Sequence, residues 1–184
     1  WLFLYVRPRL PELGVITDYQ PKIPLRVYTA DNVLIGEFGE EHRDFVPIAQ
    51  VPEMMKKALL AIEDSRFYEH NGIDFVRAGG AVLSNLRHGF GHGGGSTITM
   101  QVARNFFLTR EKVASRKLNE IMLALKIESA LSKEQILELY MNQMYLGQRS
   151  FGFGSAAQTY FGKPLSELSI AEMAMLAGLP QNPS

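Results

Sequence analysis

Acidic and basic side chains gather between residues 63 and 74, where a helical pattern gives way to a glycine. The segment contains Glu63, Asp64, Glu69, Asp74, Arg66 and His70. Adjacent helical residues point about 100° apart, so the carboxylates of Glu63 and Asp64 cannot share one face. One carboxylate can face a cleft as a general base while the other braces the loop, with Arg66 as its expected partner. By spacing alone, an ordinary charged helix end explains the same residues.

A second polar segment follows a glycine run, from residue 93 to residue 105. Glycines let the backbone approach a ligand closely, and a helix start capped by Ser96 or Thr97 offers free N–H groups and a positive dipole end. With Arg104 two turns further on, this arrangement suits an anionic group such as a phosphate. It lacks the Gly-Lys-Ser/Thr of a Walker loop. An N-capped helix behind a flexible loop is the alternative interpretation.

A third cluster consists of Arg116, Lys117 and Glu120. Side chains three and four residues apart share one side of a helix, so both cations can lie beside the carboxylate. Such a group can hold an anion. Taken alone, it is equally a solvated face with an ion pair.

The pattern along the chain predicts the elements that position these residues. Apolar spacing predicts helices over 53–66, 97–107 and 112–131, and capping-box pairs begin two more, Ser132 with Gln135 and Ser169 with Glu172. Residues 136–146 are apolar nearly all round and predict a central buried helix. Residues 25–29 and 33–38 predict a β-hairpin.

Composition narrows the possible functions. The 184 residues suit one domain with a sizeable core, and 19 basic against 19 acidic residues give no support to nucleic-acid binding. The absence of cysteine excludes disulfides and thiolate metal sites. The four histidines, His42, His70, His88 and His92, lack metal-ligand spacing and are interpreted as loop residues. The methionines Met54, Met55, Met141, Met144, Met173 and Met175 are interpreted as core filling.

The ends of the chain suggest a piece of a larger membrane protein. Trp1 to Val6 is apolar throughout and meets Arg7, Pro8 and Arg9 at once. Six residues cannot span a bilayer, which needs about 20, but the end of a transmembrane helix has this character. We therefore expect residues 1–20 to be the end of an anchor and a stalk, and residues 21–184 to be the functional domain. Apolar residues from Phe75 to Phe90 form either core or an exposed lip on a membrane.

Five segments in order resemble the peptidoglycan glycosyltransferases of bifunctional penicillin-binding proteins and monofunctional transglycosylases (glycosyltransferase family 51). The matching segments are residues 63–70, 94–99, 116–120, 136–147 and 171–180. Each is weak alone, but their order makes the signal specific. One departure is Met100, which stands where the family usually has the first of two glutamines; Gln101 keeps the second.

The resemblance implies a mainly α fold, with a lysozyme-like large lobe, a smaller membrane-proximal lobe and the short N-terminal β-hairpin. It implies polymerisation of lipid II into β-1,4-linked glycan by inverting transfer, with release of undecaprenyl diphosphate. Its expected partners are lipid II, the growing lipid-linked glycan and the membrane, with no nucleic acid. The expected location is the outer face of the bacterial cytoplasmic membrane, held by a single-pass anchor. A transpeptidase domain after residue 184 is left open.

The resemblance also assigns residues by matching position. Glu63 matches the general base and Glu120 the second essential carboxylate. The substrate-binding residues are Asp64, Arg66, His70, Ser96, Thr97, Gln101, Arg104, Asn105, Lys112, Arg116 and Lys117. Glu120 either orients Arg116 and Lys117 or helps to hold a divalent cation, magnesium or manganese, at the diphosphate; no cofactor is obligatory.

Two alternatives remain. One is a lysozyme-like glycan hydrolase or lytic enzyme, which also needs two carboxylates. The other is a non-catalytic module that binds lipid or glycan. The glycine run, the basic residues near Glu120 and the apolar N-terminus favour a lipid diphosphate donor instead.

Overall fold

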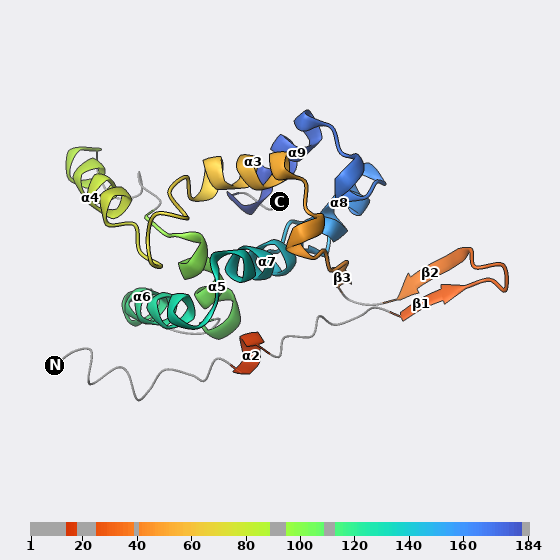
Figure 1. Ribbon diagram of the computed structural model, residues 1–184, viewed down its shortest axis with the longest axis horizontal. Helices are drawn as coiled ribbons and strands as arrows, with labels where there is room; N and C mark the ends of the chain where they lie inside the picture. Colours follow the sequence, from red (N-terminus) through yellow and green to blue (C-terminus); the bar gives the residue numbers. More distant parts are fainter. Residues whose placement is uncertain (1–13, 18–24, 39–40, 89–94, 109–112, 182–184) are drawn as a thin grey trace. The chain divides into compact units, whose positions relative to one another are not determined.

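The computed structural model describes residues 14–17, 25–38, 41–88, 95–108 and 113–181 (Figure 1). Helices dominate these residues, which confirms the mainly α prediction. Contacts divide the chain into two compact units, each built from two stretches of sequence. The first unit comprises residues 1–18 and 60–140, and the second comprises residues 19–59 and 141–184.

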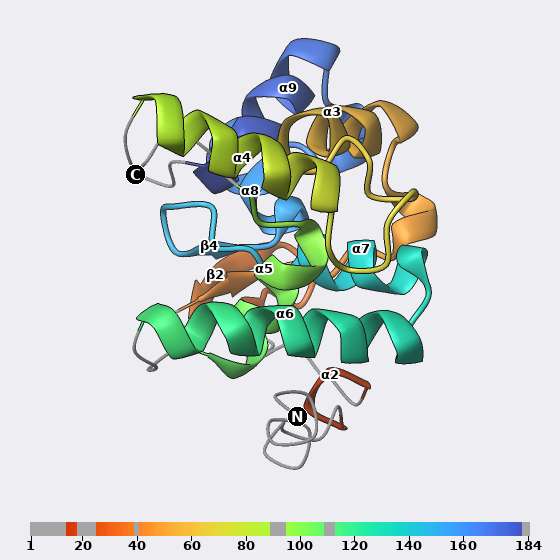
Figure 2. The ribbon, with the colours of Figure 1, turned by 90° about the vertical axis from the view of Figure 1, so that its left-hand side faces the viewer.

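The first unit is helical. In chain order it contains α2 (Gly14–Thr17), the end of α3 (Glu53–Glu63), α4 (Phe75–His88), α5 (Ile98–Phe107), α6 (Val113–Ala130) and most of α7 (Lys133–Gln143). Helices α5 and α6 pack against each other (Figure 2). Their buried residues include Ile98 and Val102 on α5 and Leu123 and Ile127 on α6.

Local signals set two helix starts in the first unit. The Thr97 hydroxyl accepts a hydrogen bond from the Met100 amide and caps α5, as predicted. Ser132 and Gln135 exchange side-chain and backbone hydrogen bonds at the start of α7, which confirms the predicted capping box. The predicted helices over 97–107 and 112–131 are confirmed within one residue at each end.

Contacts between distant segments set two of the helix ends. Helix α3 stops at Glu63, three residues before the predicted end, because the Asp64 carboxylate is held by the Ile98 amide and the chain turns at Asp64. Residues 136–143 form the predicted buried helix, but α7 ends at Gln143 instead of Leu146. The next residues pair with the β4 segment, where the Gly152 amide donates to the Met144 carbonyl.

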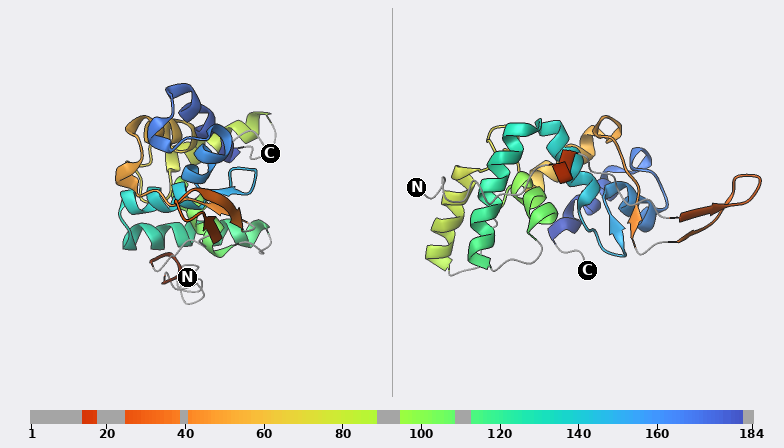
Figure 3. Two further views of the ribbon diagram at one scale, coloured as in Figure 1. Left: turned by 90° about the vertical axis from the view of Figure 1, so that its right-hand side faces the viewer. Right: turned by 90° about the horizontal axis from the view of Figure 1, so that it is seen from below.

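The second unit carries all of the described β structure. Strands β1 (Leu25–Tyr28) and β2 (Leu34–Phe38) form the predicted antiparallel hairpin (Figure 3). Strands β3 (His42–Arg43) and β4 (Ser150–Phe151) form a short parallel pair. Helices α8 (Phe153–Phe161) and α9 (Ile170–Gly178) follow, with 3₁₀ turns at Ile48–Gln50, Leu165–Glu167 and Leu179–Gln181. The predicted capping box of Ser169 and Glu172 begins α9.

Two glycines allow backbone segments of the second unit to approach closely. Gly152 has φ +87°, and a Cβ there would lie 2.9 Å from the Asn142 carbonyl oxygen. A Cβ at Gly154 would lie 2.6 Å from the Asp44 carbonyl oxygen and 2.6 Å from Val46 Cγ2. A side chain at either position would therefore require the neighbouring backbone to move.

Several sequence interpretations need correction. Met55, Met141, Met144 and Met173 are buried as expected, but Met54 and Met175 are exposed on their helices. His42 lies in β3 and His88 ends α4, so neither is a loop residue, and His92 lies outside the described residues.

The membrane-facing predictions are tested in part. Phe75 is 77% exposed and Val76 is 68% exposed, so these two residues are not core, and their contact with a membrane stays a prediction. No helix among the described residues is long and apolar enough to cross a membrane. Most of residues 1–20 lie outside the described residues, and the anchor and stalk stay a prediction, although the short α2 lies within this range.

Candidate active site

Glu63, the last residue of α3, has one carboxylate oxygen held and one unengaged. Its side chain is buried, with 7% of the residue exposed. Oε2 accepts a hydrogen bond from Gln101 Nε2 at 2.8 Å. Oε1 is buried and has no hydrogen-bond partner among the described residues. Buried polar atoms are rarely left unpaired without a reason, and a carboxylate fixed through one oxygen can receive a proton on the other.

Asp64 links the end of α3 to the start of α5. Its carboxylate is fully buried, and both oxygens lie 3.0 Å from His70 Nε2. Oδ2 also accepts from the Ile98 amide at 3.0 Å. The expected Asp64–Arg66 contact is therefore wrong, because the partners of Asp64 are His70 and the α5 backbone. His70 lies in the loop after α3, as expected, and is a buried partner of the acid.

Arg66 instead binds the acids that follow it. Its Nε donates to Glu69 at 2.8 Å and its Nη1 to Asp74 at 3.2 Å. The Arg77 amide also donates to Asp74 at 3.0 Å. The hydrogen bond from the Arg77 amide lowers the pKa of Asp74 most, and the charge of Arg66 lowers it further. Together they hold this pKa below its ordinary value, although burial alone would raise it.

Arg77 was missed in the sequence, although it contacts the backbone of the candidate base. Its Nη1 donates to the carbonyl oxygen of Glu63, the last residue of α3. The bond satisfies a carbonyl that the helix leaves open at its end. The sequence did offer one signal for Arg77. It stands three residues after Asp74, whose carboxylate accepts a hydrogen bond from the Arg77 amide.

The start of α5 differs from the predicted anion site. The Ile98 amide is bonded to Asp64 and the Met100 amide to Thr97, so these two N–H groups are not free. Thr97 is buried, and its hydroxyl donates to the Gly72 carbonyl at 2.6 Å. In this structure Thr97 holds the loop and the helix start together.

A partly buried network that the sequence did not reveal supports the loop after α3. Glu128 accepts from the Thr99 hydroxyl at 2.6 Å and from Lys133 Nζ at 2.7 Å. Lys133 also donates to the His70 carbonyl at 2.6 Å and lies 4.4 Å from the centre of the Phe67 ring. These contacts fix the loop that carries His70.

The second and third polar segments of the sequence meet at a basic cluster. Lys117 Nζ lies 2.8 Å from Ser96 Oγ and 3.2 Å from Glu120 Oε2. Arg116 Nε lies 3.7 Å from Glu120 Oε1. Glu120 is buried, whereas the two cationic side chains are partly exposed. Both cations therefore lie beside Glu120, and its functional role stays a prediction.

The remaining predicted residues lie on or near α5. Arg104 is half-buried and Asn105 is exposed, whereas Lys112 lies outside the described residues. Tyr140 on α7 was missed because it lies in an apolar run. Burial raises the pKa of Tyr140 well above its ordinary value, the charge of Glu63 raises it further and Arg104 lowers it. The charges of Glu63 and Arg104 are therefore both felt at the buried Tyr140 hydroxyl.

A metal site is not evident in the part of the chain that the structure describes. No group of three His, Cys, Asp or Glu side chains there is placed to hold an ion. Glu120, the expected ligand, is already matched by Arg116 and Lys117. The divalent cation at the diphosphate stays a prediction.

Comparison with known proteins identifies relatives over the whole chain. The sequence model of a family described as Transglycosylase matches residues 31–184. Penicillin-binding protein 1A of Neisseria cinerea is 53% identical over 181 residues, which cover 98% of this chain and 23% of that protein. The protein of the same name from Escherichia coli strain K12 is 48% identical over 183 residues, covering 100% and 22%.

Among solved structures, penicillin-binding protein 1A from Haemophilus influenzae is 31% identical, and the match covers 90% of this chain and 15% of that one, with a TM-score of 0.44. The chain spans less than a quarter of the length of these relatives.

Proposed function

This chain belongs to the transglycosylase family, and we propose that it is a peptidoglycan glycosyltransferase domain that polymerises lipid II into β-1,4-linked glycan strands. The observation that carries the proposal is the state of Glu63. One of its oxygens is oriented by Gln101, and the other is buried and unengaged among the described residues. A general base needs this combination of fixed orientation and an available oxygen.

The proposed reaction is an inverting displacement. The 4-hydroxyl of an acceptor sugar attacks the anomeric carbon of the growing glycan, and the bond from that carbon to the lipid diphosphate breaks. Glu63 Oε1 takes the hydroxyl proton, so the new glycosidic bond forms as undecaprenyl diphosphate leaves. Gln101 holds the carboxylate in place, because its Nε2 donates to the oxygen that does not react.

We assign the leaving diphosphate to the basic cluster of Ser96, Arg116 and Lys117. The departing group gains negative charge, which positioned cations and hydroxyl donors stabilise. Glu120 is buried beneath both cations and limits their movement. Arg104, whose charge lowers the pKa of Tyr140 as that of Glu63 raises it, supplies further positive charge. No step of this proposal uses a metal ion.

We also propose that the domain works at the outer face of the bacterial cytoplasmic membrane. The adjacent, exposed Phe75 and Val76 support contact with lipid, since exposed apolar side chains at the start of a helix can insert into the membrane interface. A single-pass anchor and a following transpeptidase domain belong to the same proposal. The much greater length of the relatives is consistent with both.

The test is to incubate the domain in detergent with lipid-linked disaccharide-peptide and to resolve the products by size. We expect polymer from the wild type and a loss of roughly 100-fold or more in Glu63→Gln, with the fold unchanged. Glu53→Gln is the matched control, because Glu53 is an exposed carboxylate on the same helix. More than about a tenth of the wild-type rate in Glu63→Gln would refute the base assignment.

Other outcomes identify the alternatives. Shortening of preformed glycan without polymer would indicate a hydrolase, and lipid binding without either activity would indicate a binding module.

Lys117→Ala should weaken binding of a diphosphate-bearing lipid analogue about tenfold, as expected for a lost charged hydrogen bond. Unchanged affinity would remove Lys117 from the diphosphate site.

A further inference from the structure

Two supports hold the proposed base in place, and they come from different segments of the first unit. The first is α5, from which Gln101 donates to Glu63 Oε2 at 2.8 Å. The second is the loop after α3, where Asp64 directly follows Glu63 and lies 3.0 Å from His70 Nε2. Both supports must keep the same mutual position, because a displacement of either one moves the reacting oxygen.

One ion pair, Glu128 with Lys133, contacts both supports at once. Glu128 Oε1 lies 2.6 Å from the Thr99 hydroxyl on α5 and 2.7 Å from Lys133 Nζ. Lys133 Nζ also donates to the His70 carbonyl at 2.6 Å, and it lies 4.4 Å from the centre of the Phe67 ring in the same loop. Since Glu128 lies in the last turn of α6 and Lys133 begins α7, the pair joins three helices to the loop.

The Glu128–Lys133 pair is shielded from water and closely packed. The two side chains are 7% and 17% exposed. Gly72 in the loop has φ +87°, and a Cβ there would lie 3.2 Å from Glu128 Cγ, so the loop also packs on the stem of Glu128. Removal of one partner from a buried pair leaves the other charge unpaired, at a high cost in stability. The pair is therefore a firm link between the loop and α5.

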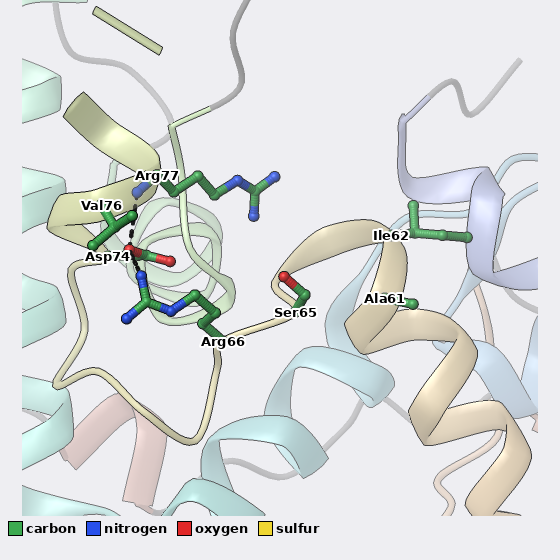
Figure 4. A pocket seen from close by; sticks show the side chains of 7 residues that line it. All are labelled: Ala61, Ile62, Ser65, Arg66, Asp74, Val76 and Arg77. Atoms are coloured by element: carbon green, nitrogen blue, oxygen red, sulfur yellow. Dashed lines mark hydrogen bonds and ion pairs between the residues drawn. The ribbon is translucent and has the colours of Figure 1, made fainter. Parts of the chain in front are cut away.

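The far end of the loop is held by other contacts. Asp74 accepts from Arg66 Nη1 at 3.2 Å and from the Arg77 amide at 3.0 Å, as Figure 4 shows. These bonds lie within the loop and the first turn of α4. Loss of the Glu128–Lys133 pair should therefore displace the part of the loop that carries His70 without releasing the end at Asp74.

We propose that Lys133, held by Glu128, is a positioning residue for the base. It keeps the loop that carries Asp64 and His70 in a fixed position relative to α5, and so sets the rate of the chemical step. The assignment rests on the proposed function. Among the described residues, Lys133 binds the loop and Glu128, and not the basic cluster assigned to the diphosphate. Its loss should therefore lower kcat and leave the KM for lipid-linked disaccharide unchanged.

Removal of one charge and removal of both charges separate positioning from stability. Lys133→Met leaves Glu128 unpaired, so the denaturant midpoint should fall, and kcat should fall at least about tenfold. Glu128→Gln/Lys133→Met leaves no unpaired charge and should recover much of the stability. Its kcat should stay as low as in Lys133→Met, because nothing replaces the bond to the His70 carbonyl. A kcat that recovers together with the midpoint would overturn the proposal.

Gly154→Ala is the control for lost stability, because its added Cβ would meet the Asp44 carbonyl in the second unit. Its midpoint should fall while kcat per folded molecule stays at the wild-type value. A higher KM with an unchanged kcat in the Lys133 variants would overturn the proposal. If Lys133→Met does not fold, Glu128→Gln/Lys133→Met carries the test alone.

A measurement without substrate separates this proposal from the proposed function. In protein with isotope-labelled histidine, the His70 imidazole resonance reports the hydrogen bond to Asp64, and His70→Gln identifies the signal. The resonance should shift in both Lys133 variants and stay in place in Gly154→Ala. An unshifted His70 resonance in both Lys133 variants would overturn the proposal even if polymer forms. Absence of polymer from the wild type would instead contradict the proposed function, and the His70 resonance would still decide whether Lys133 positions the loop.

Discussion

The two units differ in what they bury. In the first unit the buried polar residues include five ionisable groups, Glu63, Asp64, His70, Asp74 and Glu120, together with Thr97, Thr99 and Gln101. In the second unit the described buried polar residues are neutral, namely Asn142, Ser150 and Ser155. Removing charges from water is costly unless they are paired, so ionisable groups are retained inside mainly where chemistry or a specific contact requires them. The first unit is built around a site, and the second is built as a scaffold.

Two of the neutral buried side chains of the second unit, Asn142 and Ser155, form hydrogen bonds with backbone groups. Asn142 accepts from the Val46 amide at 2.8 Å and donates to the Val46 carbonyl at 2.9 Å. The Ser155 hydroxyl donates to the His42 carbonyl at 2.8 Å. These bonds join segments distant in sequence without any group that titrates. Mutations in the second unit should therefore affect stability, whereas mutations in the first should affect stability and activity together.

The largest effect is expected from Asp64→Asn in the first unit. The change removes a buried carboxylate from His70 and the Ile98 amide, so we expect a loss of about 3 kcal/mol in unfolding free energy. Activity should fall at least about tenfold, because Asp64 directly follows Glu63, the proposed base. Denaturant unfolding and the polymerisation assay measure the two effects. Asp31→Asn, in the exposed hairpin turn, should change stability by less than about 0.5 kcal/mol.

Gly154→Ala tests the scaffold. The added Cβ would meet the Asp44 carbonyl and Val46, and overpacking of this kind should cost about 2 kcal/mol. The rate per folded molecule should stay at the wild-type value. Gly178→Ala is the matched control, because a Cβ there meets open space. Loss of rate without loss of stability in Gly154→Ala would contradict the division between site and scaffold.

One helix cap from each unit, at Thr97 in the first and at Ser169 in the second, sharpens the comparison. Thr97→Ala and Ser169→Ala should each cost about 1 kcal/mol, because each hydroxyl caps a helix. Only Thr97→Ala should also reduce polymerisation, because Thr97 binds the Gly72 carbonyl at the site. Equal activity in both variants at a temperature well below their melting points would remove Thr97 from the site.

The smallest effect is expected from Glu172→Gln, measured against pH. The Ser169 amide, and next Lys163, lower the pKa of Glu172 from 4.5 to about 2. A carboxyl group with a lowered pKa stabilises the fold above its unfolded pKa and loses that contribution as pH falls through the folded value. The wild type should be slightly more stable than the variant at pH 6, and the difference should vanish between about pH 4.5 and about pH 2. A difference that is constant across this range would contradict the assignment.

The parts of this structure that depend on near neighbours in sequence could be predicted. The caps at Thr97, Ser132 and Ser169 are contacts over three residues, and the sequence pattern identified them. The same is true of Glu120 with Lys117 and Arg116, which are fixed by helical spacing.

The parts that depend on distant segments could not be predicted. Glu63 meets Gln101 across 38 residues, and Asp64 meets Ile98 across 34. The residue types alone gave no sign of these pairs, and the nearer Arg66 was the wrong choice of partner for Asp64. Tyr140 was missed because its neighbours on α7 made it look like ordinary core.

The bonds between Val46 and Asn142 have a consequence for synthesis on the ribosome. Their partners are 96 residues apart, so residues 41–46 emerge long before the segment that completes the second unit. At about 5–20 residues per second, they wait about 5–20 s for that partner. During this interval the first unit, whose last residue is Tyr140, can already have been made in full. The scaffold is thus the later part to close, although its own first strand is among the earliest described residues to leave the ribosome.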